Sequence, residues 1–170
     1  MKILAAIVVV LGLAAEPVFA EPLHFTKLIE QLPGEDAFDE FKRQKPEGTT
    51  TNSMGFHTTV VSVEFLHVDD SAKSITFQYT DGAPTQFVTM AYSALAQFSK
   101  ESTEGYEKGV KLGDFQAIEK FRNEPQDGSL TAVVGEVLVQ IDTEGLPAET
   151  LRTAWGKVPT AGIVEAKKNQ

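Results

Sequence analysis

The sequence predicts an exported α+β domain, built on a single antiparallel sheet of about six strands with helices packed mainly on one face. Three observations predict this fold. An apolar leader begins the chain, short segments of alternating hydrophobicity are separated by turn residues, and apolar residues recur at helical spacing in three places. Strands that are joined by short turns pair antiparallel, and a few helices then cover only one side of the sheet.

Residues 1–20 carry the three-part pattern of a signal peptide. One lysine is followed by an apolar run, and the small residues Val18 and Ala20 occupy positions −3 and −1 of a cleavage site. The apolar run is shorter than the about 20 residues that a membrane-spanning helix needs. We therefore expect cleavage after Ala20, which leaves residues 21–170 as a single domain. That domain would be periplasmic or secreted, with no membrane insertion after cleavage.

The composition limits the classes of partner. The chain has a net charge of −9 and no cysteine, and the leader contributes one Lys and one Glu, so its removal leaves the charge unchanged. A strongly acidic domain repels phosphate backbones and anionic lipids, so we expect a soluble protein that binds no nucleic acid. The absence of cysteine excludes a lipid-modified N-terminal cysteine and a thiol nucleophile.

The N-terminal half begins with a helix and continues with strands. Apolar residues at helical spacing predict a short helix from His24 to Leu32, which Pro33-Gly34 ends. The polar segment from Gln44 to Gly55 indicates a long loop or a weak edge strand. Alternating hydrophobicity then predicts two strands, His57–His67 and Lys73–Asp81, which a polar turn joins into a hairpin.

A central amphipathic helix is predicted from Pro84 to Ser99, because the hydrophobic period changes there from two residues to three or four. Proline suits the first turn of such a helix. We expect its apolar stripe to face the core, and the stripe comprises Phe87, Met90, Ala91, Ala94, Leu95 and Phe98.

Four strands and a last helix follow. Gly113-Asp114 predicts a hairpin turn, and Gly135-Glu136 marks a shift of the apolar phase that indicates either a tight turn or a bulge, of which we favour the turn. A helix is expected to open at Pro147 and to end at Pro159, with Trp155 as a core anchor. We expect the tail beyond this helix to be loose.

No motif assigns a catalytic, cofactor-binding or metal-ligating residue, and no cofactor is expected. His57 and His67 would lie about 33 Å apart on one strand, and His24 stands alone in the first helix. Neither a Gly-x-Ser-x-Gly elbow nor a Ser-x-x-Lys motif occurs. A pair of carboxylates suited to glycoside hydrolysis stays open, because the separation of two acids depends on the fold.

The order of the predicted helices and strands is similar to that of a known group of proteins. The first helix ends in Leu32-Pro33-Gly34, the central helix runs into the segment from Ser102 to Gly109, and hairpins and a terminal helix follow. In this order the chain resembles small exported bacterial domains of uncharacterised function and, more remotely, the PsbP-like fold. The resemblance implies an accessory or binding role rather than an enzymatic one, and it places no functional residue on a position of this sequence.

The leading hypothesis is an exported non-catalytic envelope protein that binds a protein partner or a small apolar ligand. An apolar ligand would lie in a cavity between the stripe from Phe87 to Phe98 and the sheet. The alternative is a periplasmic hydrolase that uses dispersed carboxylates or a single histidine. It would need a concave pocket that holds His57, or two acids within about 5–10 Å. A purely structural envelope component is the third possibility.

Overall fold

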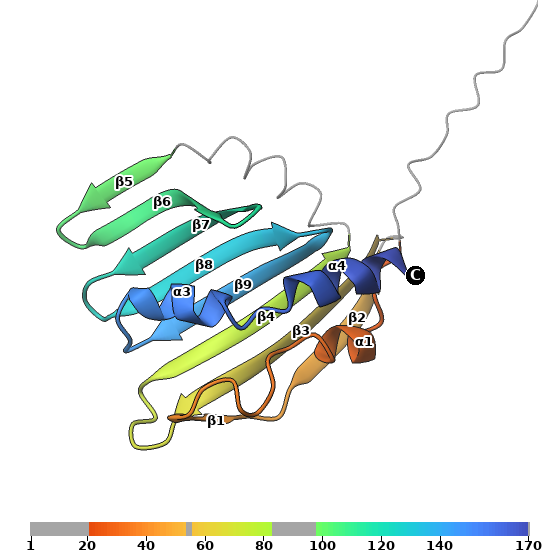
Figure 1. Ribbon diagram of the computed structural model, residues 1–170, viewed down its shortest axis with the longest axis horizontal. Coiled ribbons are helices and arrows are strands. Elements are labelled where there is room, and N and C mark those ends of the chain that lie inside the picture. The colour runs from red at the N-terminus through yellow and green to blue at the C-terminus, as the bar shows by residue number, and fades with distance from the viewer. Residues whose placement is uncertain (1–20, 54–55, 83–97, 170) are drawn as a thin grey trace, which may run out of the picture.

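The computed structural model describes residues 21–53, 56–82 and 98–169 (Figure 1). These residues form one nine-stranded antiparallel sheet and three short helices. In chain order the elements are α1 (Phe25–Ile29), β1 (Phe41–Arg43), β2 (Glu47–Ser53), β3 (Phe56–His67), β4 (Ser74–Gly82), β5 (Ser99–Ser102), β6 (Gly105–Leu112), β7 (Phe115–Arg122), β8 (Asp127–Val134), β9 (Val137–Glu144), α3 (Glu149–Trp155) and α4 (Thr160–Lys168).

The sheet joins two groups of consecutive strands. Its order is β1-β3-β4-β9-β8-β7-β6-β5, and β2 pairs with β3 on the same edge as β1. The strands β5 to β9 form a simple meander, in which each strand pairs with the next. The two groups meet where β4 pairs with β9, from Ser74 opposite Glu144 to Asp81 opposite Val137. The centre of the sheet therefore depends on a long-range pairing.

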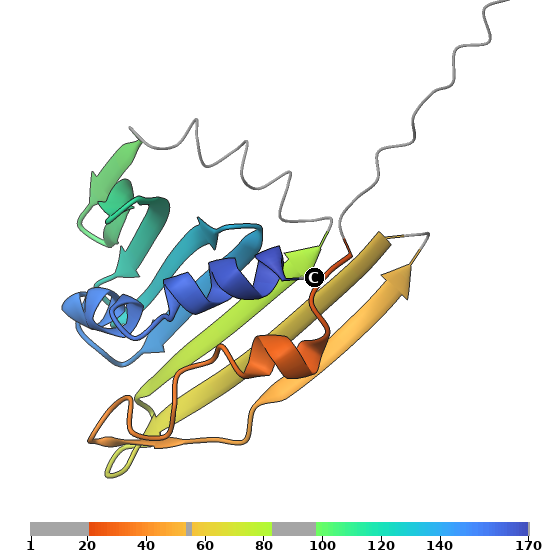
Figure 2. The same cartoon turned by 45° about the vertical axis from the view of Figure 1, so that its right-hand side comes forward.

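The hydrophobic core lies between the helices and one face of the sheet, here called the helix-side face (Figure 2). Burial alternates along β3, β4 and β9, as expected for strands with one covered face. Phe65 and Phe77 meet edge to face there, with ring centroids 5.8 Å apart. None of the described helices packs on the opposite face, which is called the open face below. It carries mainly polar and charged side chains.

The expectation of an α+β fold built on a sheet of about six strands is wrong, because the described residues are mostly β and form a nine-stranded sheet. The described helices have only five, seven and nine residues. Two of the additional strands, β1 and β2, are polar and lie at the edge of the sheet. They bury few apolar side chains, and the hydrophobic alternation that identifies a strand was therefore absent from their sequence.

The predicted hairpins agree with the structure. The preferred reading of Gly135-Glu136 as a turn is confirmed, since Val134 pairs with Val137 across a two-residue connection. At the other predicted turn Gly113 adopts a φ of 62°, a conformation that favours glycine. The predicted central helix falls on residues 83–97, which lie outside the described residues. Its predicted last residue, Ser99, belongs instead to β5.

The prediction of a loose tail is wrong, because α4 occupies it. Helix α3 ends at Trp155 rather than at the predicted Pro159, and Pro159 is instead the N-cap residue of a second helix. Ile163 of α4 is fully buried in the core. Trp155 lies half-buried at the rim of the core, with its ring centroid 5.9 Å from that of Phe115.

Candidate functional site

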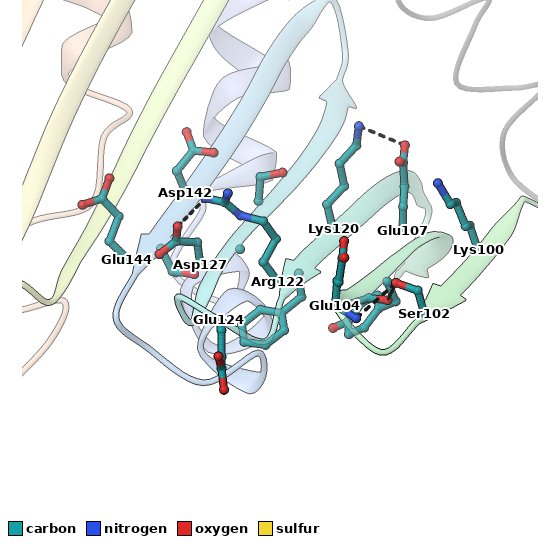
Figure 3. Close-up of a pocket in the computed structure, with 16 residues that line it drawn as sticks. Lys100, Ser102, Glu104, Glu107, Lys120, Arg122, Glu124, Asp127, Asp142 and Glu144 are labelled. Atoms are coloured by element: carbon teal, nitrogen blue, oxygen red, sulfur yellow. Dashed lines mark hydrogen bonds and ion pairs between the residues drawn. The ribbon is translucent and has the colours of Figure 1, made fainter.

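A charged groove crosses the open face over strands β5 to β9 (Figure 3). The strand register explains how it forms, because residues paired across neighbouring strands project to the same face. One such row runs across five strands and contains Lys100, Glu107, Lys120, Ser129 and Asp142. The groove has a volume of about 680 Å³. Among the described residues, six carboxylates and three cationic side chains line it, so the charge of this lining is negative.

Ion pairs occupy the part of the groove over β6, β7 and β8. The Lys120 ammonium lies 2.9 Å from a Glu107 carboxylate oxygen, and the Arg122 guanidinium donates to Asp127. Because Lys120 and Arg122 are largely exposed, we expect these pairs to contribute little to stability. They fix the positions of two cations and two carboxylates on one wall of the groove.

The part over β9 is electrostatically different. Asp142 accepts a hydrogen bond of 2.8 Å from the Gln140 amide, and among the described residues no cation lies within ion-pair distance of Asp142 or Glu144. Burial raises the pKa of Asp142 above its ordinary value, and the charge of Glu144 raises it further. A partly buried carboxylate without a counter-charge would be stabilised by a cation brought by a ligand.

The lining decides which chemistry suits the groove. Charged groups and the hydroxyls of Ser102 and Ser129 suit a polar ligand better than an apolar one. The three histidines do not meet: His24 caps α1, and His57 and His67 lie at opposite ends of β3, outside the groove lining. Within the described ranges, no group of three or more metal-ligating side chains is placed to hold a metal ion.

A second polar cluster lies on the helix-side face around Glu119, whose side chain is only 2% exposed. Its carboxylate accepts hydrogen bonds from the Tyr106 hydroxyl at 2.7 Å and from the Arg152 guanidinium at 3.0 Å. The Lys108 ammonium lies 3.5 Å from the same carboxylate and 4.0 Å from the centre of the Tyr106 ring. These contacts fasten α3 to β6 and β7, and burial together with the Glu119 hydrogen bond raises the pKa of Tyr106.

A third cluster joins both ends of the described chain to β4. Asp81 is 1% exposed and accepts a hydrogen bond of 2.7 Å from the Leu23 backbone N–H. The Lys167 ammonium donates to both Asp81 oxygens, at 3.2 and 3.1 Å, and also reaches the Glu21 carbonyl and the Glu136 carboxylate. We call these residues the Asp81 clasp. Its contacts are satisfied internally, which indicates a structural role.

No known protein family, no curated protein and no solved structure matches this chain. The resemblance to the PsbP-like fold therefore stays a prediction. No helix within the described residues is long and apolar enough to cross a membrane.

The sequence assigned no site residue, and the structure explains why the groove escaped notice. Its residues come from five strands and from two turns between strands, so no residue spacing along the sequence marks them as one site. Only the register across the meander brings Lys100 and Asp142 into one row. Glu119 did leave a signal, because it interrupts the apolar alternation of Ala117 and Phe121 on the core-facing side of β7.

Proposed function

We propose that the protein is an exported, non-catalytic binding module, and that its open-face groove takes a basic segment of a partner protein. The observation that carries the proposal is the uncompensated β9 wall of the groove, where burial raises the pKa of Asp142 and Glu144 adds a second negative charge. A Lys or Arg side chain placed there would gain a charge-assisted hydrogen bond.

The opposite wall supports the same reading. Lys120 and Arg122 are already engaged with Glu107 and Asp127, so the groove offers alternating charges rather than a uniform acidic surface. Charge alternation of this kind fixes the register of a partner segment more than it increases the affinity. The leader sequence supports the exported location, and the resemblance stated above supports an accessory role.

The version of the hypothesis with a small apolar ligand depends on residues 83–97, which lie outside the described residues. The charged lining of the groove favours the protein partner. The single-histidine form of the hydrolase alternative gains no support, since His57 lies outside the groove lining. The carboxylate form stays a hypothesis, because several carboxylates line the groove and none of them is assigned a catalytic role.

Site-specific photo-crosslinking tests the proposal. A photoreactive amino acid is placed at Ser129, in the floor of the groove, in the full chain produced by its own cells. A matched variant carries the same group at Thr153, which is exposed on α3 at the other side of the sheet. We expect a discrete protein adduct from position 129 alone, which disappears when Asp142→Asn and Glu144→Gln are combined. Equal adducts from both positions, no adduct from position 129, or an adduct that survives the double substitution would each overturn the proposal.

A further inference from the structure

The two edges of the sheet are protected to very different degrees. An edge strand presents unpaired backbone donors and acceptors, and proteins guard such strands with charges, with prolines or by keeping them short. Strand β5 is guarded in this way, because it has four residues and two of them are Lys100 and Glu101. Strand β1 is shorter still and carries Lys42 and Arg43.

Strand β2 lacks these protections. It has seven residues, and its burial pattern shows six of them exposed. Its single charge is Glu47 at the first position, and the six residues that follow are Gly48, Thr49, Thr50, Thr51, Asn52 and Ser53. Threonine favours extended backbone, so the segment is well suited to pairing. A neutral stretch of this kind is conspicuous in a chain with a net charge of −9.

The strand is also held in a regular extended conformation by its neighbours. Its inner edge pairs with β3 without interruption, from Glu47 opposite Ser62 to Ser53 opposite Phe56. Helix α1 supports the helix-side face of the strand at Gly48, which packs closely against Phe25 and Ile29. No other strand of the described chain pairs with β2, and Figure 2 shows it as the outermost strand on that side.

We propose that β2 pairs antiparallel with β2 of a second copy about a two-fold axis, so that the two sheets become one. With the axis at Thr50, each Thr50 faces its counterpart and each Glu47 faces Ser53 of the second copy, so no like charges meet. Cross-strand threonine pairs are favourable. This chain already contains one such pair, since the hydroxyls of Thr50 and Thr59 lie 2.9 Å apart.

The absence of charge along most of β2 favours a second copy of the chain over a charged foreign segment as the occupant. The neutral edge offers nothing that would recognise a basic or an acidic segment, whereas it is complementary to itself. Two chains of net charge −9 repel each other at long range, and salt screens this repulsion. The dimer therefore strengthens as salt is added, and a complex with a basic segment would weaken. The β2 edge lies at the opposite end of the sheet from the groove, so the inference does not depend on the proposed function.

Analytical ultracentrifugation of the mature chain tests the dimer, over a range of concentrations at about 0.05 and 0.5 M salt. The test variant is Thr51→Lys, which places a charge on the exposed open-face side of β2. The control is Ser99→Lys, which adds the same charge to the exposed β5 edge outside the groove lining. We expect a concentration-dependent dimer that is tighter at high salt, a dissociation constant at least about tenfold weaker for Thr51→Lys, and wild-type behaviour for Ser99→Lys.

Hydrogen exchange of the wild-type chain provides a second readout, which does not depend on how well the variant folds. Backbone amides of β2 should exchange more slowly as the protein concentration rises, and amides of β5 should not. A monomer at every concentration would overturn the inference. So would a dimer that Thr51→Lys leaves unchanged, a dimer that salt weakens, or exchange in β2 that is independent of concentration.

Discussion

Replacing Lys167 by Met should destabilise the fold strongly, because it removes the only cation within ion-pair distance of Asp81 among the described residues. The side chains of Asp81 and Lys167 are 1% and 8% exposed, so water reaches neither charge easily. Among the described residues, the Asp81 carboxylate would then keep only the Leu23 N–H as a hydrogen-bond partner. Breaking a buried ion pair by removing one member costs about 3–5 kcal/mol. The free energy of unfolding of a single domain is about 5–15 kcal/mol, so this loss is a large fraction of the total stability.

Urea unfolding followed by the fluorescence of Trp155, the single tryptophan, measures this loss. The matched control is Lys168→Met, which removes an exposed lysine from the next position of α4 and should change the free energy of unfolding by less than about 0.5 kcal/mol. Combining Lys167→Met with Asp81→Asn removes the buried charge as well and should recover part of the stability. A loss below about 1 kcal/mol for Lys167→Met would mean that Asp81 is not left as an uncompensated buried charge, since such a charge costs more than this.

Three further substitutions test other buried groups. Glu119→Gln should lower the free energy of unfolding by about 1–2 kcal/mol, because it weakens the charged hydrogen bonds that partly exposed cations make to Glu119. Calorimetry that shows no change would contradict a stabilising role for this cluster. Tyr79→Phe should raise the melting temperature, because the Tyr79 hydroxyl is buried with no hydrogen-bond partner among the described residues; a lower melting temperature would indicate that the hydroxyl is satisfied. Asp142→Asn should stabilise the fold at pH 7. The folded state raises the pKa of Asp142 above the ordinary 3.8 and so binds the proton more tightly than the unfolded state, which means that stability is lost as the pH rises through this range. The advantage of the variant should vanish below pH 3.8, and an advantage that does not depend on pH would contradict this explanation.

The sequence predicted the strands with strong hydrophobic alternation, missed β1 and β5, and left the segment that contains β2 open between a long loop and a weak edge strand. The strand β3 was expected at His57–His67 and lies at Phe56–His67, because Val61, Val63 and Phe65 alternate into the core. Strand β2 is held by backbone pairing with β3 rather than by apolar burial, so hydrophobicity could not place it. The polar strands β1, β2 and β5, added to the six predicted strands, make the described fold mainly β.

Helix α4 and the buried ionic clusters were not predicted from the sequence, for a different reason. The last residues have the composition of a polar tail, and nothing near Lys167 in the sequence indicates that it pairs with Asp81, which lies 86 positions earlier in the chain. Similarly, Glu119 finds Arg152 only after α3 packs against the sheet. Such pairings depend on tertiary contacts, which the spacing of residues along a chain does not contain.

Mass spectrometry of the crosslink from position 129 tests the proposed binding of a basic segment in the open-face groove of an exported domain. We expect a crosslinked chain that begins at Glu21, joined to a Lys- or Arg-rich segment of another exported protein. A chain that retains residues 1–20, or a crosslinked segment without basic residues, would contradict it.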